Sequence, residues 1–124
     1  MSRDAWLQQT REREEAFDRI VTPVREAMAQ RLAQQLGLAG VWSNHHGATG
    51  IDPRHLYIYF VLPKRRDVER LLASPLWIEA RSELLHELEA CGYPVAALQP
   101  PWLGCVSQQA CDEEAAGNWY HFFK

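Results

Sequence analysis

The chain has 124 residues, a mass of 14.3 kDa, 47% hydrophobic and 23% charged residues, and a formal net charge of −3 at pH 7. This composition is that of an ordinary globular protein, and it predicts one domain spanning residues 1–124. The acidic balance disfavours a general nucleic-acid binder, because such proteins neutralise phosphates with clustered Lys and Arg.

The cysteines and the hydropathy pattern indicate where the protein resides. There are three cysteines without a Cys-x-x-Cys pair, no signal-peptide pattern, and no apolar run near the roughly 20 residues that a membrane span needs. We therefore expect a cytoplasmic protein with no membrane partner and no cofactor. The excess of Arg over Lys, eleven to two, is typical of a GC-rich bacterial genome.

A helix is predicted over residues 6–36, where apolar residues recur at three- and four-residue spacing. Thr22 and Pro23 interrupt the pattern. Thr22 can serve as an N-cap with Pro23 as the first helical residue, which predicts a kink or a fresh start of the helix. Gly37 is the expected end of the helix.

Two strands follow. Residues 41–44 form a short strand candidate, and residues 55–62 form the clearest one, with Leu56, Ile58, Phe60 and Leu62 facing one way. The segment between them contains Gly47, Gly50 and Asp52-Pro53, which are turn residues. The pattern predicts a long hairpin loop.

A second helical region follows Pro63. The segment 64–73 predicts a short helix with Asp67 as its N-cap, and Ser74-Pro75 begins another helix that Gly92 closes. Beyond it, residues 93–98, 103–107 and 118–123 read as three further strands, the last two separated by an acidic loop over residues 108–117. The predicted class is α+β: a mixed or antiparallel sheet of four to five strands with helices packed on one face, in the order α-β-β-α-β-β-β.

Histidines near the predicted hairpin are the weak candidates for a metal or hydrolytic site. His45, His46 and His55 could act with Asp52, since neutral imidazole binds metal and a carboxylate fixes its tautomer. Adjacent histidines on a strand point to opposite faces, and no His-Glu-x-x-His motif is present. The spacing therefore predicts no metal and no catalytic residue.

A basic corner at residues 63–70 is the candidate nucleic-acid site. It contains Lys64, Arg65 and Arg66, and Tyr57 and Tyr59 of the preceding strand could stack on bases. Acidic residues follow at once, and no known nucleic-acid-binding motif is present.

The acidic C-terminal third supplies the preferred partner-binding surface. Residues 81–124 carry six acidic and two basic side chains. The carboxylates of Asp112, Glu113 and Glu114 lie near Trp102 and Trp119 in the sequence, and together these five residues suit a basic protein partner.

Three function classes follow in order of preference. The first is a protein-binding module, such as an inhibitor or immunity-type protein of a toxin-antitoxin pair, that binds a basic toxin, nuclease or effector. The second is an RNA- or ribosome-associated domain that uses the basic corner. The third is a small His/Asp-dependent hydrolase. No catalytic motif was found, so we expect a protein that is not an enzyme.

Overall fold

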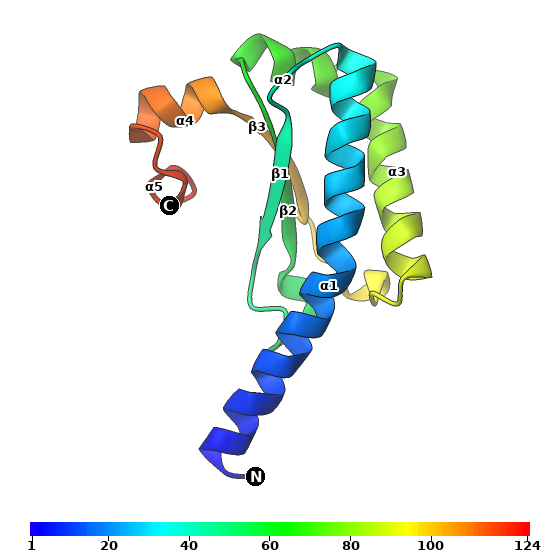
Figure 1. The fold of residues 1–124 in the computed structure, drawn as a ribbon, viewed down its shortest axis with the longest axis vertical. Helices are drawn as coiled ribbons and strands as arrows, with labels where there is room; N and C mark the ends of the chain where they lie inside the picture. Colours follow the sequence, from blue (N-terminus) through cyan, green and yellow to red (C-terminus); the bar gives the residue numbers. More distant parts are fainter.

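A computed structural model describes residues 1–124. In chain order it contains α1 (Arg3–Leu36), β1 (Trp42–His46), η1 (Pro53–His55), β2 (Tyr57–Leu62), α2 (Arg65–Leu72), α3 (Pro75–Ala90), η2 (Val95–Ala97), β3 (Leu103–Ser107), α4 (Gln108–Ala115) and α5 (Trp119–Phe122), where η marks a 3₁₀ turn (Figure 1).

The sheet has three strands in the order β1-β2-β3. The hairpin partners β1 and β2 are antiparallel, whereas β3 returns parallel to β2 after the α2–α3 crossover. The prediction of an α+β protein is confirmed. The prediction of four to five strands in the order α-β-β-α-β-β-β is wrong.

Local hydrogen bonding explains the two strands that do not form. At residues 93–98, Pro94 has no N–H for a ladder, and the chain makes the 3₁₀ turn η2 instead. At residues 118–123, the side chain of Asn118 accepts from the N–H of His121 and begins the short helix α5. The alternating aromatic residues there gave a strand-like pattern, but the cap determined the local structure.

The predicted acidic loop is the helix α4. Ser107 ends β3 and caps this helix, because its hydroxyl accepts from the N–H of Ala110 at 3.0 Å. The Gln, Ala and Glu residues that follow are good helix formers. One residue therefore ends a strand and begins a helix.

The fresh helix start predicted at Thr22 and Pro23 is wrong, because α1 runs through Pro23 as one helix. The predicted end at Gly37, whose φ is 65°, is confirmed. Lys64, rather than Asp67, is the N-cap of α2. Asp67 lies three residues on, and its carboxylate accepts from the N–H of Lys64 at 2.9 Å.

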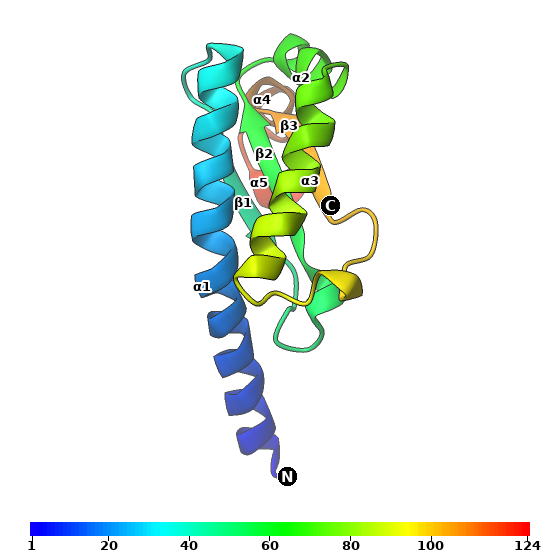
Figure 2. The ribbon, with the colours of Figure 1, turned by 90° about the vertical axis from the view of Figure 1, so that its right-hand side faces the viewer.

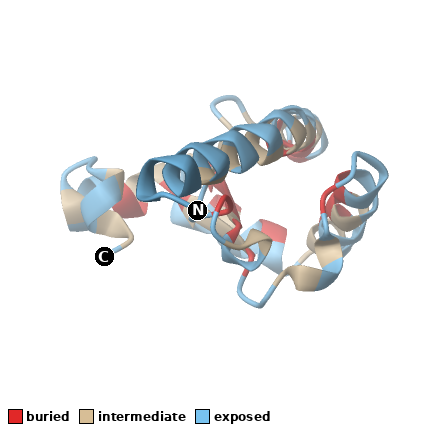
Figure 3. Ribbon diagram, turned by 90° about the horizontal axis from the view of Figure 1, so that it is seen from below, coloured by how far each residue is buried: buried red, intermediate tan, exposed pale blue.

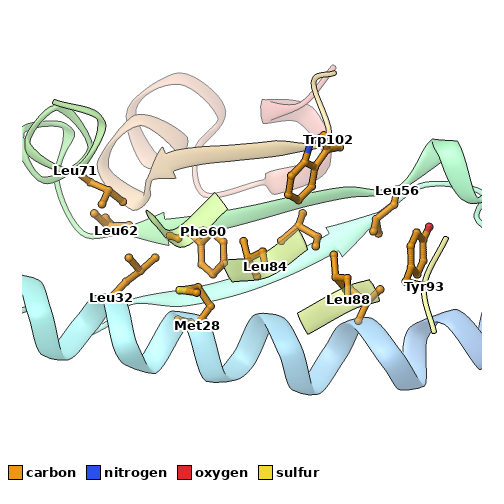
Figure 4. Packing of buried hydrophobic residues seen from close by; sticks show 14 of the residues in the cluster. Met28, Leu32, Leu56, Phe60, Leu62, Leu71, Leu84, Leu88, Tyr93 and Trp102 are labelled. Carbon is orange, nitrogen blue, oxygen red and sulfur yellow. The ribbon is translucent and has the colours of Figure 1, made fainter. Parts of the chain in front are cut away.

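Helices lie on both sides of the sheet, not on one. Figures 1 and 2 show α1 and α3 over one face, while α4 and α5 lie on the other side. The main core fills the α1–α3 side and includes the even-numbered residues of β2, which face one way as predicted. Figure 4 shows these side chains meeting α1 and α3; the core includes Met28, Leu32, Leu56, Ile58, Phe60, Leu62, Leu84 and Leu88.

Burial is concentrated in the sheet and on the inner helix faces, whereas the first turns of α1 are exposed (Figure 3). Trp6 and Leu7, in these turns, are large apolar residues that remain exposed. No helix, including the 34-residue α1, is both long and apolar enough to cross a membrane.

Candidate functional site

The second face of the sheet carries a layer of aromatic rings. Register places His46 opposite Tyr57 and Asn44 opposite Tyr59, so the side chains of these four residues lie on the face away from α1. The aromatic side chains of helix α5 pack on this face. We define the aromatic layer as Trp42, His46, Tyr57, Tyr59, Trp119, Phe122 and Phe123.

The rings of the layer pack edge to face and in offset stacks. The centroids of Tyr59 and Phe123 are 4.6 Å apart, and those of Trp42 and Trp119 are 5.4 Å apart at 89°. Such pairs add to the stabilisation that burial of their area gives. The layer attaches α5 to the sheet.

Tyr57 needs space that only glycine in the neighbouring strand provides. A Cβ at Gly104 of β3 would overlap the hydroxyl of Tyr57. The Tyr57 ring therefore lies across β3 and stacks on Tyr59 at 6.1 Å. Burial raises the pKa of both phenols, so both remain neutral donors at neutral pH.

His46 is the titratable group of the layer. Its ring lies 5.1 Å from that of Tyr57 and 5.5 Å from that of Phe123. Partial desolvation by the surrounding rings, and secondarily the neighbouring His45, lower the pKa of His46 below its usual value of 6.5. The layer therefore favours an uncharged imidazole.

A pocket of about 350 Å³ opens at the outer end of the layer. We call it the aromatic pocket; it is lined by His46, Tyr59, Trp119, Tyr120, Phe123 and Lys124. Tyr120 is 72% exposed, and the ammonium of Lys124 lies 4.9 Å from the centroid of its ring. That distance is within the range of a cation–π interaction.

The three carboxylates of α4 lie near this pocket in the chain, and two of them contact the basic corner in space. Arg65 of α2 pairs with both Glu113 and Glu114. Hydrogen bonding to Arg65 is the main reason that the pKa of Glu113 is lowered. Asp112 instead accepts from the side chain of Gln108 at 3.0 Å. The candidate acidic and basic sites therefore touch each other.

Trp102 lies apart from the other predicted partner-binding residues. It is 4% exposed and belongs to the main core on the α1–α3 side. The guanidinium of Arg81 on α3 lies 5.6 Å from the centroid of its ring. Trp119, by contrast, lies in the aromatic layer and lines the pocket.

The four predicted metal or catalytic residues do not converge. His45 faces α1 while His46 lies in the aromatic layer, as expected for neighbours on a strand. Asp52 caps η1 by accepting from the N–H of Arg54, and His55 is exposed. No group of three His, Cys, Asp or Glu side chains is placed to hold a metal ion.

His45 has an Asp partner, as a general base would, but both ring nitrogens are occupied. Its Nε2 lies 2.8 Å from a carboxylate oxygen of Asp18, and its Nδ1 accepts from Nε of Arg25 at 2.8 Å. No ring nitrogen is left for a substrate. These contacts join α1 to β1.

The cysteines are not arranged as nucleophiles. Burial raises the pKa of Cys105 to about 12 and also raises that of Cys111, and neither thiol has a histidine partner among the hydrogen bonds. Cys91 is exposed just after α3.

The predicted nucleic-acid residues are likewise divided. Lys64, Arg65 and Arg66 are exposed, but Arg65 is already paired with acids. Tyr59 is only 4% exposed because α5 covers it. The two tyrosines thus stack on each other and on protein rings.

Sequence reasoning did not identify Tyr120, Phe123 and Lys124 as site residues. The available signal was Asn118, a good N-cap placed directly before a run of aromatic residues. Recognising Asn118 as an N-cap would have predicted a short helix that carries aromatic side chains on more than one of its sides.

Comparison of the chain with protein-family models, with curated proteins and with solved structures finds no match.

Proposed function

We propose that this chain is a protein-binding module that receives a Lys or Arg side chain of a basic partner in the aromatic pocket. One observation carries the proposal: Lys124 already places its ammonium over Tyr120, at the edge of a pocket lined by four aromatic residues. Aromatic faces attract cations through their quadrupole, and more strongly where water is partly excluded. Lys124 thus occupies the position that a partner's cation would take.

The acidic end of α4 supports a basic partner. Asp112, Glu113 and Glu114 lie in the C-terminal half of this eight-residue helix, where the helix dipole already disfavours negative charge. Arg65 offsets part of this repulsion for the two glutamates. A cationic partner would relieve the rest and would be steered toward the neighbouring pocket.

An inhibitor or immunity-type protein is the specific form of this proposal. A basic toxin or nuclease would supply the positive charge, and aromatic residues such as Tyr120 and Trp119 are frequent anchors of tight interfaces. Trp102 is left out of the proposed surface because the core encloses it.

A peptide titration tests the proposal directly. Fluorescein-labelled hexa-arginine should bind the protein with a saturable rise in anisotropy, whereas labelled hexa-glutamate should not. Tyr120→Ala should weaken binding about two- to fivefold, since one exposed cation–π contact contributes about 0.5–1 kcal/mol.

Ile78→Ala is the matched control, because Ile78 is 73% exposed but lies on α3, on the other side of the sheet. It should bind like the parent protein. Equal binding of hexa-arginine to Tyr120→Ala and the parent would contradict the proposed pocket.

A further inference from the structure

We propose that two copies of this chain pair through the outer edge of β3, which would join two three-stranded sheets into one six-stranded sheet. This inference is independent of the proposed function, because the edge of β3 and the aromatic pocket are different surfaces.

The hydrogen-bond pattern shows that β3 has an unpaired edge. The N–H of Ile58 donates to the carbonyl of Trp102 at 2.8 Å, and Ile58 is in register with Leu103. In a parallel pair this arrangement directs the even-numbered residues of β3 toward β2. Leu103 and Cys105 therefore point their N–H and carbonyl groups away from the sheet, and β3 has no strand on that side.

The opposite edge of the sheet is occupied. The N–H of His45 donates to the side chain of Asn44 instead of to a strand, which places the backbone groups of Ser43 and His45 on the outer side of β1. Arg25 of α1 donates to the carbonyl of Ser43 at 3.0 Å. Side chains that cover edge groups in this way protect a strand against further pairing.

This difference between the two sheet edges determines which strand can pair with β3. With β1 covered, the edge that a second copy can offer is its own β3, so the pairing is symmetric and closes as a dimer. A dimer of this kind leaves only the covered β1 edges at its two ends. A filament, which needs β1 to pair with β3, is disfavoured.

The surroundings of β3 suit such a pairing. A groove of about 280 Å³ wraps over this edge, since its lining includes Cys105 and Val106, which face opposite sides of the strand. Val68 of α2 and Phe122 of α5 form apolar walls. No Asp, Glu, Lys or Arg occurs between Glu89 and Asp112, so β3 itself carries no charge. The groove is also lined by Arg65 and Glu69 of α2, whose opposite charges balance each other.

Antiparallel pairing centred on Cys105 would satisfy the outward-pointing backbone N–H and carbonyl groups of β3. Cys105 would exchange backbone bonds with its counterpart, and Leu103 would lie opposite Ser107 of the second copy, giving about four backbone hydrogen bonds. The Leu103 side chain, which packs on its own core, would then lie beside Ser107 at the groove of the other copy.

Sedimentation with charge-swap variants tests the dimer. The parent protein should show a mass that rises with concentration from 14.3 kDa toward twice that value, up to about 1 mM. Val106→Lys and Val106→Glu should each remain monomeric, because like charges would lie diagonally across the symmetry axis, and an equimolar mixture of the two should restore the dimer. The restored mixture also shows that both variants fold.

Ile78→Lys and Ile78→Glu are the matched controls and should dimerise like the parent. Amide exchange then locates the interface: the N–H of Cys105 should exchange at least about tenfold more slowly in the dimer, while that of Val106, which faces β2, should be slow at every concentration. A chain that stays monomeric to about 1 mM, or a dimer that survives Val106→Lys with a fast-exchanging Cys105 amide, would overturn the proposal.

Discussion

Nε of Arg25 lies 2.8 Å from Nδ1 of His45, and this contact fixes the tautomer of the histidine. Arginine can only donate, so Nδ1 carries a lone pair and the proton of the neutral ring is on Nε2, facing Asp18 at 2.8 Å. The same guanidinium also reaches the hydroxyl and the carbonyl of Ser43. A residue that resembles part of a catalytic dyad therefore acts as a link between α1 and β1.

Replacing Arg25 by Met should destabilise the protein by about 1–3 kcal/mol, because the half-buried acceptors of Ser43 and His45 would lose their donor. Urea unfolding followed by circular dichroism measures the change. The control is His55→Ala, which removes an exposed histidine and should stay within about 0.5 kcal/mol of the parent. An equal effect of the two substitutions would show that the Arg25 contacts do not hold α1 to the sheet.

His46 should make the folded state less stable at acidic pH. Its pKa is lowered in the folded protein, so the unfolded chain binds more protons and stability falls as the pH drops through 6.5 and below. His46→Gln, which cannot take up a proton, should flatten this dependence. Melting temperatures between pH 5 and pH 8 measure it, and parallel curves for the two proteins would contradict the assignment.

Gly104→Ala should destabilise the protein by about 1–3 kcal/mol, since the new methyl group must displace the Tyr57 ring. Tyr57→Phe removes the hydroxyl atom nearest the new methyl group. A double-mutant cycle should therefore show that Gly104→Ala costs less in the Tyr57→Phe background. Additive effects would mean that Tyr57 does not lie over β3.

The α4 carboxylates should contribute to the rate of association. The triple variant Asp112→Asn, Glu113→Gln and Glu114→Gln should bind hexa-arginine with a slower on-rate and a weaker dependence on salt, because steering is a screened, long-range effect. Stopped-flow measurements at about 0.01 M and 0.15 M salt compare association under weak and strong electrostatic screening. An unchanged on-rate at both salt concentrations would show that α4 is only a solvated helix.

Removal of Lys124 should strengthen cation binding. In Lys124→Ala the ring of Tyr120 loses its internal cation, so hexa-arginine no longer competes with it. The midpoint of the anisotropy titration should therefore occur at a lower protein concentration. Weaker binding by Lys124→Ala would instead show that Lys124 helps to hold the pocket in shape.

The core and the hairpin could be predicted because one strong pattern determined each. Alternation along β2 placed Ile58, Phe60 and Leu62 in the core, and the turn residues after β1 gave the long loop. These signals depend on the periodicity of apolar residues, which the sequence contains directly. The predicted helix end at Gly37 is also confirmed.

The C-terminal third could not be predicted in the same way, because short caps outweighed the longer pattern. Asn118 begins a helix where alternating aromatic residues favoured a strand, and Ser107 begins one where the acidic segment 108–117 was predicted to be a loop. The pairing of Arg65 with Glu113 joins residues 48 positions apart, and nothing in either segment indicates its partner. The candidate site was therefore located only in part, at Trp119.

Site-specific photocrosslinking tests the central claim most directly, namely that the aromatic pocket binds a basic protein. A photoreactive benzoylphenylalanine is placed at Tyr120, or at Ile78 as the control, and the chain is expressed in its native cell and irradiated. The proposal predicts a discrete adduct with a basic protein from position 120 that is absent from position 78 and is lost when Trp119→Ala is added. No adduct from position 120, or the same adducts from both positions, would contradict it.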